Sequence, residues 1–166
     1  MKKGLWILFV LLALGWSSAC ALTMQLETAQ GTMTVVLPEG FMLAEAEAAR
    51  DRPGARYTFR HTGAGMEINV HTMLDNEKDQ EIILRKVRDP SNGIVLFENI
   101  GIGGRNYMAY YAEAYNWQWT LLMRTETGYS YRFRFVLPEE QGQDTLPPMI
   151  EEIMASGILL TGISFE

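Results

Sequence analysis

The chain has 166 residues, of which 48% are hydrophobic and 20% are charged, with a formal net charge of −6 at pH 7 and a single cysteine. The negative charge argues against nucleic acid or anionic lipid headgroups as partners, because both are bound through basic patches. One cysteine cannot form a disulfide within the chain, so a fold of this length depends on its hydrophobic core.

The first 21 residues have the pattern of an export signal. A positive start at residues 2–3 precedes an apolar run over 5–16, which is shorter than the roughly 20 residues of a membrane-spanning helix. Small residues at 17–21 end in Ala-Cys-Ala, which predicts cleavage after Ala21. The alternatives are lipoprotein processing, in which Cys20 becomes a lipidated N-terminus, and an uncleaved anchor.

Cleavage after Ala21 would leave 166 − 21 = 145 residues, the usual size of one domain, so we expect residues 22–166 to form a single domain. Removing the two lysines at 2–3 takes the formal charge from −6 to −8. The predicted location is extracytoplasmic. The protein would be either free or attached to the membrane only through a lipid on Cys20.

Alternating apolar residues predict a first hairpin over residues 24–37. A turn at 30–31 would set Leu26 opposite Val35. After a break at 38–40 the chain resumes, and its Ala- and Glu-rich run over 44–49 fits either a helix or an edge strand.

A second hairpin is predicted over residues 56–73, with its loop at 62–65. In this register one face is apolar, and the other is polar with matched charge, as a half-buried sheet requires. The predicted pairs are Phe59 with Ile68, Tyr57 with Val70, Thr58 with Asn69 and Arg60 with Glu67.

Two helices are predicted. The first spans 75–88, where Asp75 or Asn76 can cap it, and its basic C-terminal end suits the helix dipole. The second begins near Thr145, which can cap it, and ends at Gly157. The apolar stripes expected to be buried are Ile82, Ile83 and Val87 in the first helix, and Met149, Ile150, Ile153 and Met154 in the second.

The stretch 106–137 predicts three consecutive antiparallel strands around which the fold is organised. A three-residue turn at 126–128 has glycine last, at the position that needs positive φ, and a two-residue turn is expected at 115–116. In the first strand the alternate face, with Tyr107 and Tyr111, is apolar enough to be partly covered. The side chains expected on the buried face are Met108, Tyr110, Ala112, Trp117, Trp119, Leu121, Met123, Tyr131, Phe133 and Phe135.

With further strands at 94–102 and 158–160, these elements predict an α+β fold. We expect a mostly antiparallel sheet of about seven strands, flanked by helices as an α/β/α sandwich.

The order of these elements and three short motifs resemble PsbP-like proteins. Val36-Leu37-Pro38-Glu39-Gly40-Phe41 is similar to their "LP-x-G-aromatic" opening, Gly103-Gly104-Arg105-Asn106-Tyr107 to their glycine-led approach to the central meander, and residues 150–156 to their C-terminal helix. The resemblance spans about residues 24–163. It implies the fold of a group that includes secreted and lipoprotein bacterial members, the photosystem II extrinsic protein and a Ran-binding import factor. It also implies a binding or assembly module, and it transfers no functional residue.

Few residues suit catalysis or metal binding. His61 and His71 are the only histidines, and the second hairpin places them on opposite faces, roughly 17 Å apart, so they cannot share a metal ion. Adjacent carboxylates at 139–140 and 151–152 do not face each other if helical, which favours a solvated surface. We therefore predict no catalytic residue, no metal site and no cofactor.

Arg124, Arg132 and Arg134 are the one candidate site in the expected sheet. Arg132 and Arg134 alternate with aromatic residues, so they are predicted to line the other face of the sheet together with Arg124. Such a strip can receive a carboxylate from a ligand or partner, or it can pair with the protein's own acids.

The sequence therefore favours a secreted, non-catalytic binding or assembly module of the bacterial envelope with a protein partner. One alternative is a lipid-anchored accessory subunit of a transport or secretion complex. Another is a small secreted enzyme that uses carboxylate chemistry.

Overall fold

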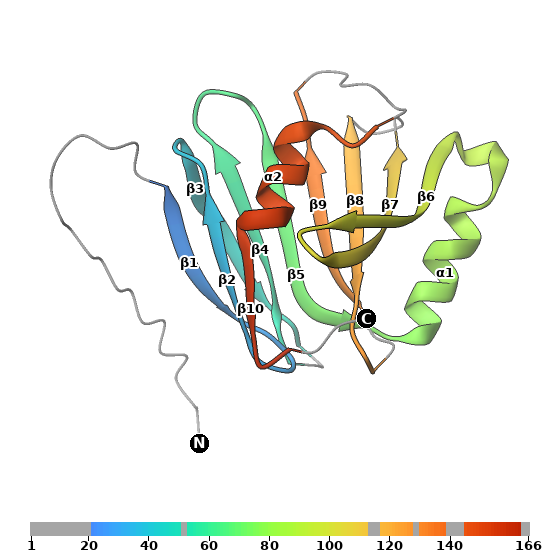
Figure 1. Cartoon of the computed structure of the whole chain (residues 1–166), viewed down its shortest axis with the longest axis horizontal. Helices are drawn as coiled ribbons and strands as arrows, with labels where there is room; N and C mark the ends of the chain where they lie inside the picture. The colour runs from blue at the N-terminus through green and yellow to red at the C-terminus, as the bar shows by residue number, and fades with distance from the viewer. Residues whose placement is uncertain (1–20, 51–52, 113–116, 128–129, 139–144, 164–166) are drawn as a thin grey trace, which may run out of the picture.

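The computed structural model of the protein describes residues 21–50, 53–112, 117–127, 130–138 and 145–163. Within these ranges the chain forms an α+β fold, as predicted, with two antiparallel sheets and two short α-helices (Figure 1). No helix in this part of the chain is long and apolar enough to cross a membrane.

The larger sheet has seven strands in the order β3-β4-β5-β9-β8-β7-β6, and the smaller has three in the order β1-β2-β10. The elements in chain order are β1 (Leu22–Glu27), β2 (Thr32–Leu37), β3 (Phe41–Ala48), β4 (Ala55–His61), β5 (Glu67–Asp75), α1 (Glu77–Val87), the 3-10 helix η1 (Pro90–Asn92), β6 (Ile94–Ile102), β7 (Arg105–Ala112), β8 (Gln118–Arg124), β9 (Ser130–Val136), α2 (Pro148–Ser156) and β10 (Ile158–Thr161).

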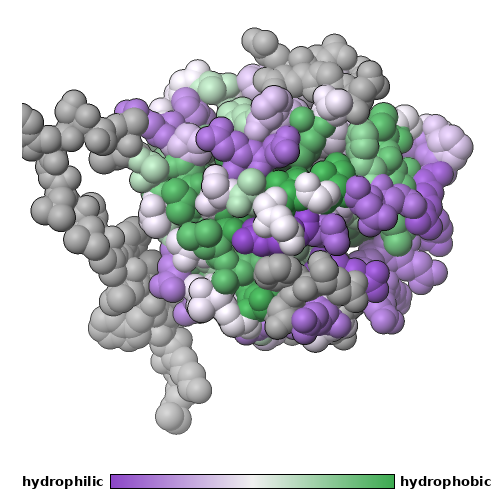
Figure 2. Space-filling view, in the orientation of Figure 1, coloured by the Kyte–Doolittle hydropathy of each residue, from purple (hydrophilic) through white to green (hydrophobic). Residues whose placement is uncertain are grey.

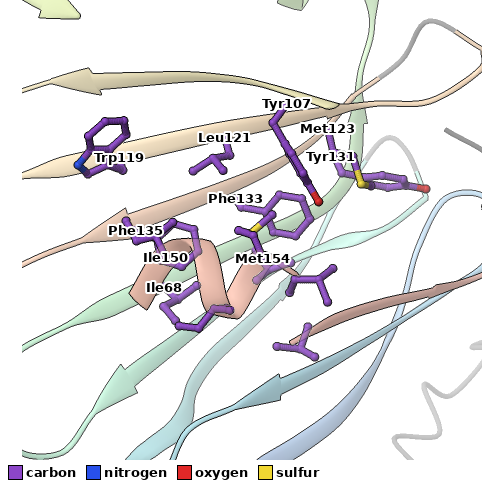
Figure 3. Packing of buried hydrophobic residues seen from close by; sticks show 14 of the residues in the cluster. Ile68, Tyr107, Trp119, Leu121, Met123, Tyr131, Phe133, Phe135, Ile150 and Met154 are labelled. Carbon is purple, nitrogen blue, oxygen red and sulfur yellow. The ribbon is translucent and has the colours of Figure 1, made fainter. Parts of the chain in front are cut away.

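The smaller sheet and α2 cover one face of the seven-stranded sheet, which we call the inner face (Figure 1). Large apolar side chains from both layers meet there, and α2 inserts its buried stripe between them (Figure 3). The sequence predicts one sheet, whereas the first hairpin pairs with β10 and forms a layer of its own. Core residues with at most 1% exposure include Leu26, Met33, Ile68, Trp119, Leu121, Phe133, Phe135, Ile150 and Met154.

Two of the predicted hairpins are confirmed with their registers. In β4–β5, Phe59 lies opposite Ile68 and Arg60 opposite Glu67, as expected. In β8–β9 the predicted pairs also hold, which are Met123 with Tyr131, Leu121 with Phe133 and Trp119 with Phe135. Both registers could be read from local alternation because only one pairing brings apolar faces together.

The prediction for β7 is wrong by one residue. Tyr107 pairs with Met123 and Tyr111 with Trp119, so the buried face carries Tyr107, Ala109 and Tyr111. A shift of one residue moves every side chain to the opposite face. Met108, Tyr110 and Ala112 are consequently only half-buried, on the other side of the sheet. The predicted turn at 115–116 lies outside the described residues.

The first hairpin also differs from its predicted register, by two residues. Leu26 lies opposite Met33 instead of Val35, which leaves the same side chains buried. The cause is a longer turn held by Thr28, whose Oγ1 donates to Gly31 O at 2.9 Å and accepts from Gly31 N at 2.9 Å. Hydrogen bonds from a side chain to the backbone, of this kind, locally replace the hydrogen bonds between the two strands.

The structure decides between the alternatives left open for the run over 44–49 and for the helix caps. The run over 44–49 lies mainly in β3, an edge strand of the larger sheet. Helix α1 is capped by Asn76, whose Oδ1 accepts from Asp79 N at 2.9 Å. Helix α2 begins at Pro148 without a side-chain cap, so the cap predicted at Thr145 is wrong.

Each helix buries a narrower stripe than predicted. In α1 only Val87 is buried, and Ile82 is 49% exposed because the helix rests on the sheet through its other side. In α2, Ile150, Ile153 and Met154 are buried as predicted, whereas Met149 is 36% exposed.

Helix α1 crosses the outer face of the larger sheet, opposite α2. Strands β5 and β6 are separated by β9, β8 and β7, and because each neighbouring pair is antiparallel, β5 and β6 run in the same direction. A connection between parallel strands must cross the sheet, and α1 makes this crossover. It covers one end of the outer face.

Candidate functional site

The three predicted arginines lie on the outer face of the seven-stranded sheet. Arg132 and Arg134 are two residues apart on β9, and Arg124 lies on the neighbouring β8, opposite Ser130. Since alternate residues share a face, all three side chains start from the same side of the sheet. The structure therefore brings the candidate residues together on adjacent strands.

Arg132 binds a carboxylate of the protein itself. Its Nε and Nη2 donate to Asp75 Oδ2 at 3.0 and 2.6 Å. The Asp75 side chain is only 8% exposed, and that of Arg132 is 27% exposed. Asp75 ends β5 just before α1, so this ion pair fixes the point where the crossover leaves the sheet.

Arg134 stands in a polar row where α1 does not cover the sheet. It lies opposite Asn69 on β5 and Thr120 on β8, and its side of the strand is exposed. Among the described residues, no ion pair joins Arg134 to a carboxylate.

A hydrogen-bonded network lies beside Arg134. Asn69 Nδ2 donates to Glu67 Oε1 at 2.8 Å, and Arg60 Nε donates to Glu67 Oε2 at 3.0 Å. Partial burial alone would raise the pKa of Glu67, but these two hydrogen bonds and the charges of Arg60 and Arg134 outweigh burial and hold that pKa below its ordinary value. Thr58 Oγ1 completes the network by donating to Asn69 Oδ1 at 3.0 Å.

A groove of about 370 Å³ lies between α1 and the outer face. The β6 wall of the groove is formed at a β-bulge between Phe97 and Ile100, which leaves Glu98 and Asn99 outside the regular ladder. Bulges often redirect side chains at binding sites. At this wall Arg88 Nη2 donates to Glu98 Oε1 at 2.7 Å.

The floor of the groove has two rows of different character. One row has the polar residues Ser130, Arg124 and Asn106 from three neighbouring strands. The next row has Leu122 paired with Met108, and Leu122 is only 3% exposed beneath the helix. The sequence did not predict this groove. Its one signal was the polar pair at 98–99 within an otherwise apolar strand.

The two histidines have separate surroundings. His61 Nδ1 accepts from the backbone N–H groups of Gly63 at 3.1 Å and Ala64 at 2.8 Å, so this histidine holds the β4–β5 loop. His71 lies opposite Arg56 and Arg132, on the outer face of the sheet, whereas His61 belongs to the opposite face. Within the described ranges, no group of three metal-ligating side chains comes together.

The remaining candidates add no site to the described part of the chain. Glu151 and Glu152 are exposed on α2. The pair at 139–140 and the possible lipidation residue Cys20 lie outside the described residues.

Apolar surface appears on the side of the molecule formed by the smaller sheet. Figure 2 shows hydrophobic side chains over this sheet, where Leu159 is 48% exposed, and mainly hydrophilic colour over α1. Single exposed apolar residues are ordinary on folded proteins. The arginines of the outer face remain the more distinctive feature.

The chain matches no family model, no curated protein and no solved structure.

Proposed function

We propose that this protein is an exported, non-catalytic binding or assembly module of the bacterial envelope. In this proposal a protein partner binds the part of the outer face that α1 leaves uncovered. The single observation that carries the proposal is Arg134, an exposed arginine on β9, which is the central strand of the seven-stranded sheet and lies between β5 and β8.

The expected partner presents carboxylates. A guanidinium binds a carboxylate through two parallel N–H···O bonds, which gives both orientation and strength. Arg132 is held by Asp75, whereas the side chain of Arg134, on the same strand, is exposed to solvent. Arg134 is therefore the residue we expect to meet the partner.

The proposed assignment to the PsbP-like group is supported by where the motifs lie in the fold. The "LP-x-G-aromatic" motif forms the turn between β2 and β3. The glycine motif forms the turn into β7, where Gly103 and Gly104 both have positive φ, of 57° and 77°. The C-terminal motif supplies α2. The proposal includes the α/β/α sandwich architecture of that group.

The test is capture from an envelope extract by the immobilised protein, comparing Arg134→Glu with Arg85→Glu. Arg85 is an exposed arginine on α1, so its variant has the same charge change at another place. We expect a defined partner that elutes with raised salt, is retained by the Arg85→Glu protein and is lost with Arg134→Glu. Equal capture by both variants would exclude the outer face as the interface.

The mode of attachment to the envelope is a separate part of the proposal. If Cys20 carries lipid, Cys20→Ala releases the protein from membranes. If cleavage follows Ala21, the substitution leaves the protein soluble as before. Mass spectrometry of the mature N-terminus distinguishes the two.

A further inference from the structure

We propose that the groove between α1 and the outer face binds a small organic monocarboxylate with an apolar chain. This inference goes beyond the proposed function, because it concerns the covered end of the sheet and needs no protein partner. Polar and apolar side chains occupy separate rows of the groove.

A row of hydrogen-bond donors lies at one level of the sheet. Arg124 lies opposite Ser130 on β9, and Asn106 on β7 lies one residue beyond the Tyr107–Met123 pair, which places it opposite Arg124 on the other side. Neighbouring strands are about 4.8 Å apart, so a guanidinium, a hydroxyl and an amide line one short stretch of the groove. Together these groups suit the two oxygens of a carboxylate.

Arg124 can serve a ligand while it keeps its contacts within the protein, because a guanidinium has five N–H donors. The acid in the groove wall, Glu98, is already bound by Arg88. Both members of that pair are more than half exposed, at 58% and 60% for Arg88 and Glu98. An exposed pair of this kind rearranges easily when a ligand enters.

A row of apolar side chains lies next to these donors. Leu122 and Met108 are paired on the sheet two residues further along their strands, so this row starts about 7 Å from the donors. Leu84 of α1 lines the groove as well. A ligand anchored by its carboxylate at Arg124 would lay a chain of several methylene groups between the helix and this row. A volume of about 370 Å³ is within the range of small-molecule sites, roughly 300–1,000 Å³.

The experiment is calorimetric titration of the full-length chain with hexanoate, acetate and hexanamide. We expect hexanoate to bind, and acetate to bind at least about tenfold more weakly because it lacks the methylene chain. Hexanamide, which has the chain without the charge, should also bind at least about tenfold more weakly. Two-dimensional NMR should place the hexanoate-induced shifts at Leu122 and Met108.

Variants test the donors directly. Arg124→Gln should weaken hexanoate binding at least about tenfold, and Arg134→Gln, on the same face outside the groove, should leave it within about twofold. Asn106→Ala, at an exposed position, provides a second donor variant if Arg124→Gln does not fold. The proposal is overturned if hexanoate does not bind at millimolar concentration, if the neutral amide binds equally well, or if neither donor variant weakens binding. Each of these results leaves partner capture through Arg134 untouched.

Discussion

Arg132 and Arg134 are neighbours on one strand and nevertheless have different environments. Arg132 is bonded twice to Asp75, while Arg134 is exposed beside the network of Glu67. Their alternation with aromatic residues predicts the face that they share. It does not predict which of them is bound by an acid, because Asp75 lies far away in the sequence and reaches Arg132 only through the pairing of β5 with β9.

Removing Arg132 should reduce stability more than removing Arg134. Arg132→Met leaves the carboxylate of Asp75 almost buried without its partner, and we expect a loss of about 2 kcal/mol, below the roughly 3–5 kcal/mol of fully buried pairs because Arg132 is partly exposed. Arg134→Met should stay within about 0.5 kcal/mol, as for most surface changes. Urea unfolding of both variants measures the difference, and equal losses would contradict a structural role for the Asp75 pair.

Glu67 should make the fold sensitive to acid. Its pKa is lower in the folded protein than the ordinary value of 4.5, so the ionised form stabilises the fold. This contribution is complete above pH 4.5 and is lost as the pH falls through the lower folded value. Glu67→Gln should therefore flatten the decrease in unfolding free energy below pH 4.5, whereas Glu81→Gln on α1 should retain it. Identical pH profiles for wild type and Glu67→Gln would contradict the network.

Strand β7 is the element whose orientation the sequence leaves undecided. Both faces of it are apolar, with Tyr107 and Tyr111 on one and Met108 and Tyr110 on the other. The observed register places the small Ala109 opposite Leu121 and packs the Tyr111 ring against Trp119, at 5.3 Å between centroids and an interplanar angle of 52°. Which face of β7 is buried depends on how these rings pack against the second layer. The alternation of residues within one strand carries no information about that packing.

Two tyrosines adjacent on β7 test its orientation. Tyr111 is 1% exposed on the inner face, so Tyr111→Ala should cost about 3–5 kcal/mol, as truncation of buried aromatic residues does. Tyr110 is half-buried on the outer face, and Tyr110→Ala should cost about 1 kcal/mol. Chemical denaturation of both variants provides the comparison. A larger loss for Tyr110→Ala would restore the register predicted from the sequence.

How far the sequence predicts the fold depends on how local each contact is. The hairpins at β4–β5 and β8–β9 follow from alternation and turn residues, and both are confirmed. The separate three-stranded sheet does not follow, because β2 pairs with β10 from the far end of the chain. The groove likewise depends on a bulge in β6 and on where α1 crosses, neither of which leaves a periodic signal.

At the scale of the whole molecule, the two layers are joined by a few close contacts. Tyr131 Oη of β9 donates to Thr28 Oγ1 in the β1–β2 turn at 3.1 Å. Arg105 Nη1 of β7 donates to Ile158 O of β10 at 2.8 Å. Within the smaller layer, the backbone oxygen of Gly157, between α2 and β10, accepts from Val36 N of β2 at 2.7 Å. Each contact joins residues distant in sequence, so the layers depend on one another for stability.

Gly157 should not tolerate a side chain. A Cβ at this position would lie 2.5 Å from Val36 O and 2.7 Å from Ile153 O, so Gly157→Ala forces β10 and β2 apart. We expect a loss of about 1–3 kcal/mol, typical of overpacking. Gly63→Ala is the matched control, because its nearest contact would be an ordinary 3.9 Å from His61. Thermal unfolding should show a lower midpoint for Gly157→Ala only, and two unchanged midpoints would contradict the tight junction.

The arrangement of the small sheet also constrains how the chain reaches its folded state. Strand β2 lies between β1, which precedes it directly in the chain, and β10, which follows all the other described strands. A partly synthesised chain therefore holds β2 with one open edge, and the second layer cannot close until Ile158–Thr161 have left the ribosome. Pairing over so long a separation is slow. Closure of the second layer is therefore a late step of folding, after the local hairpins of the larger sheet have paired.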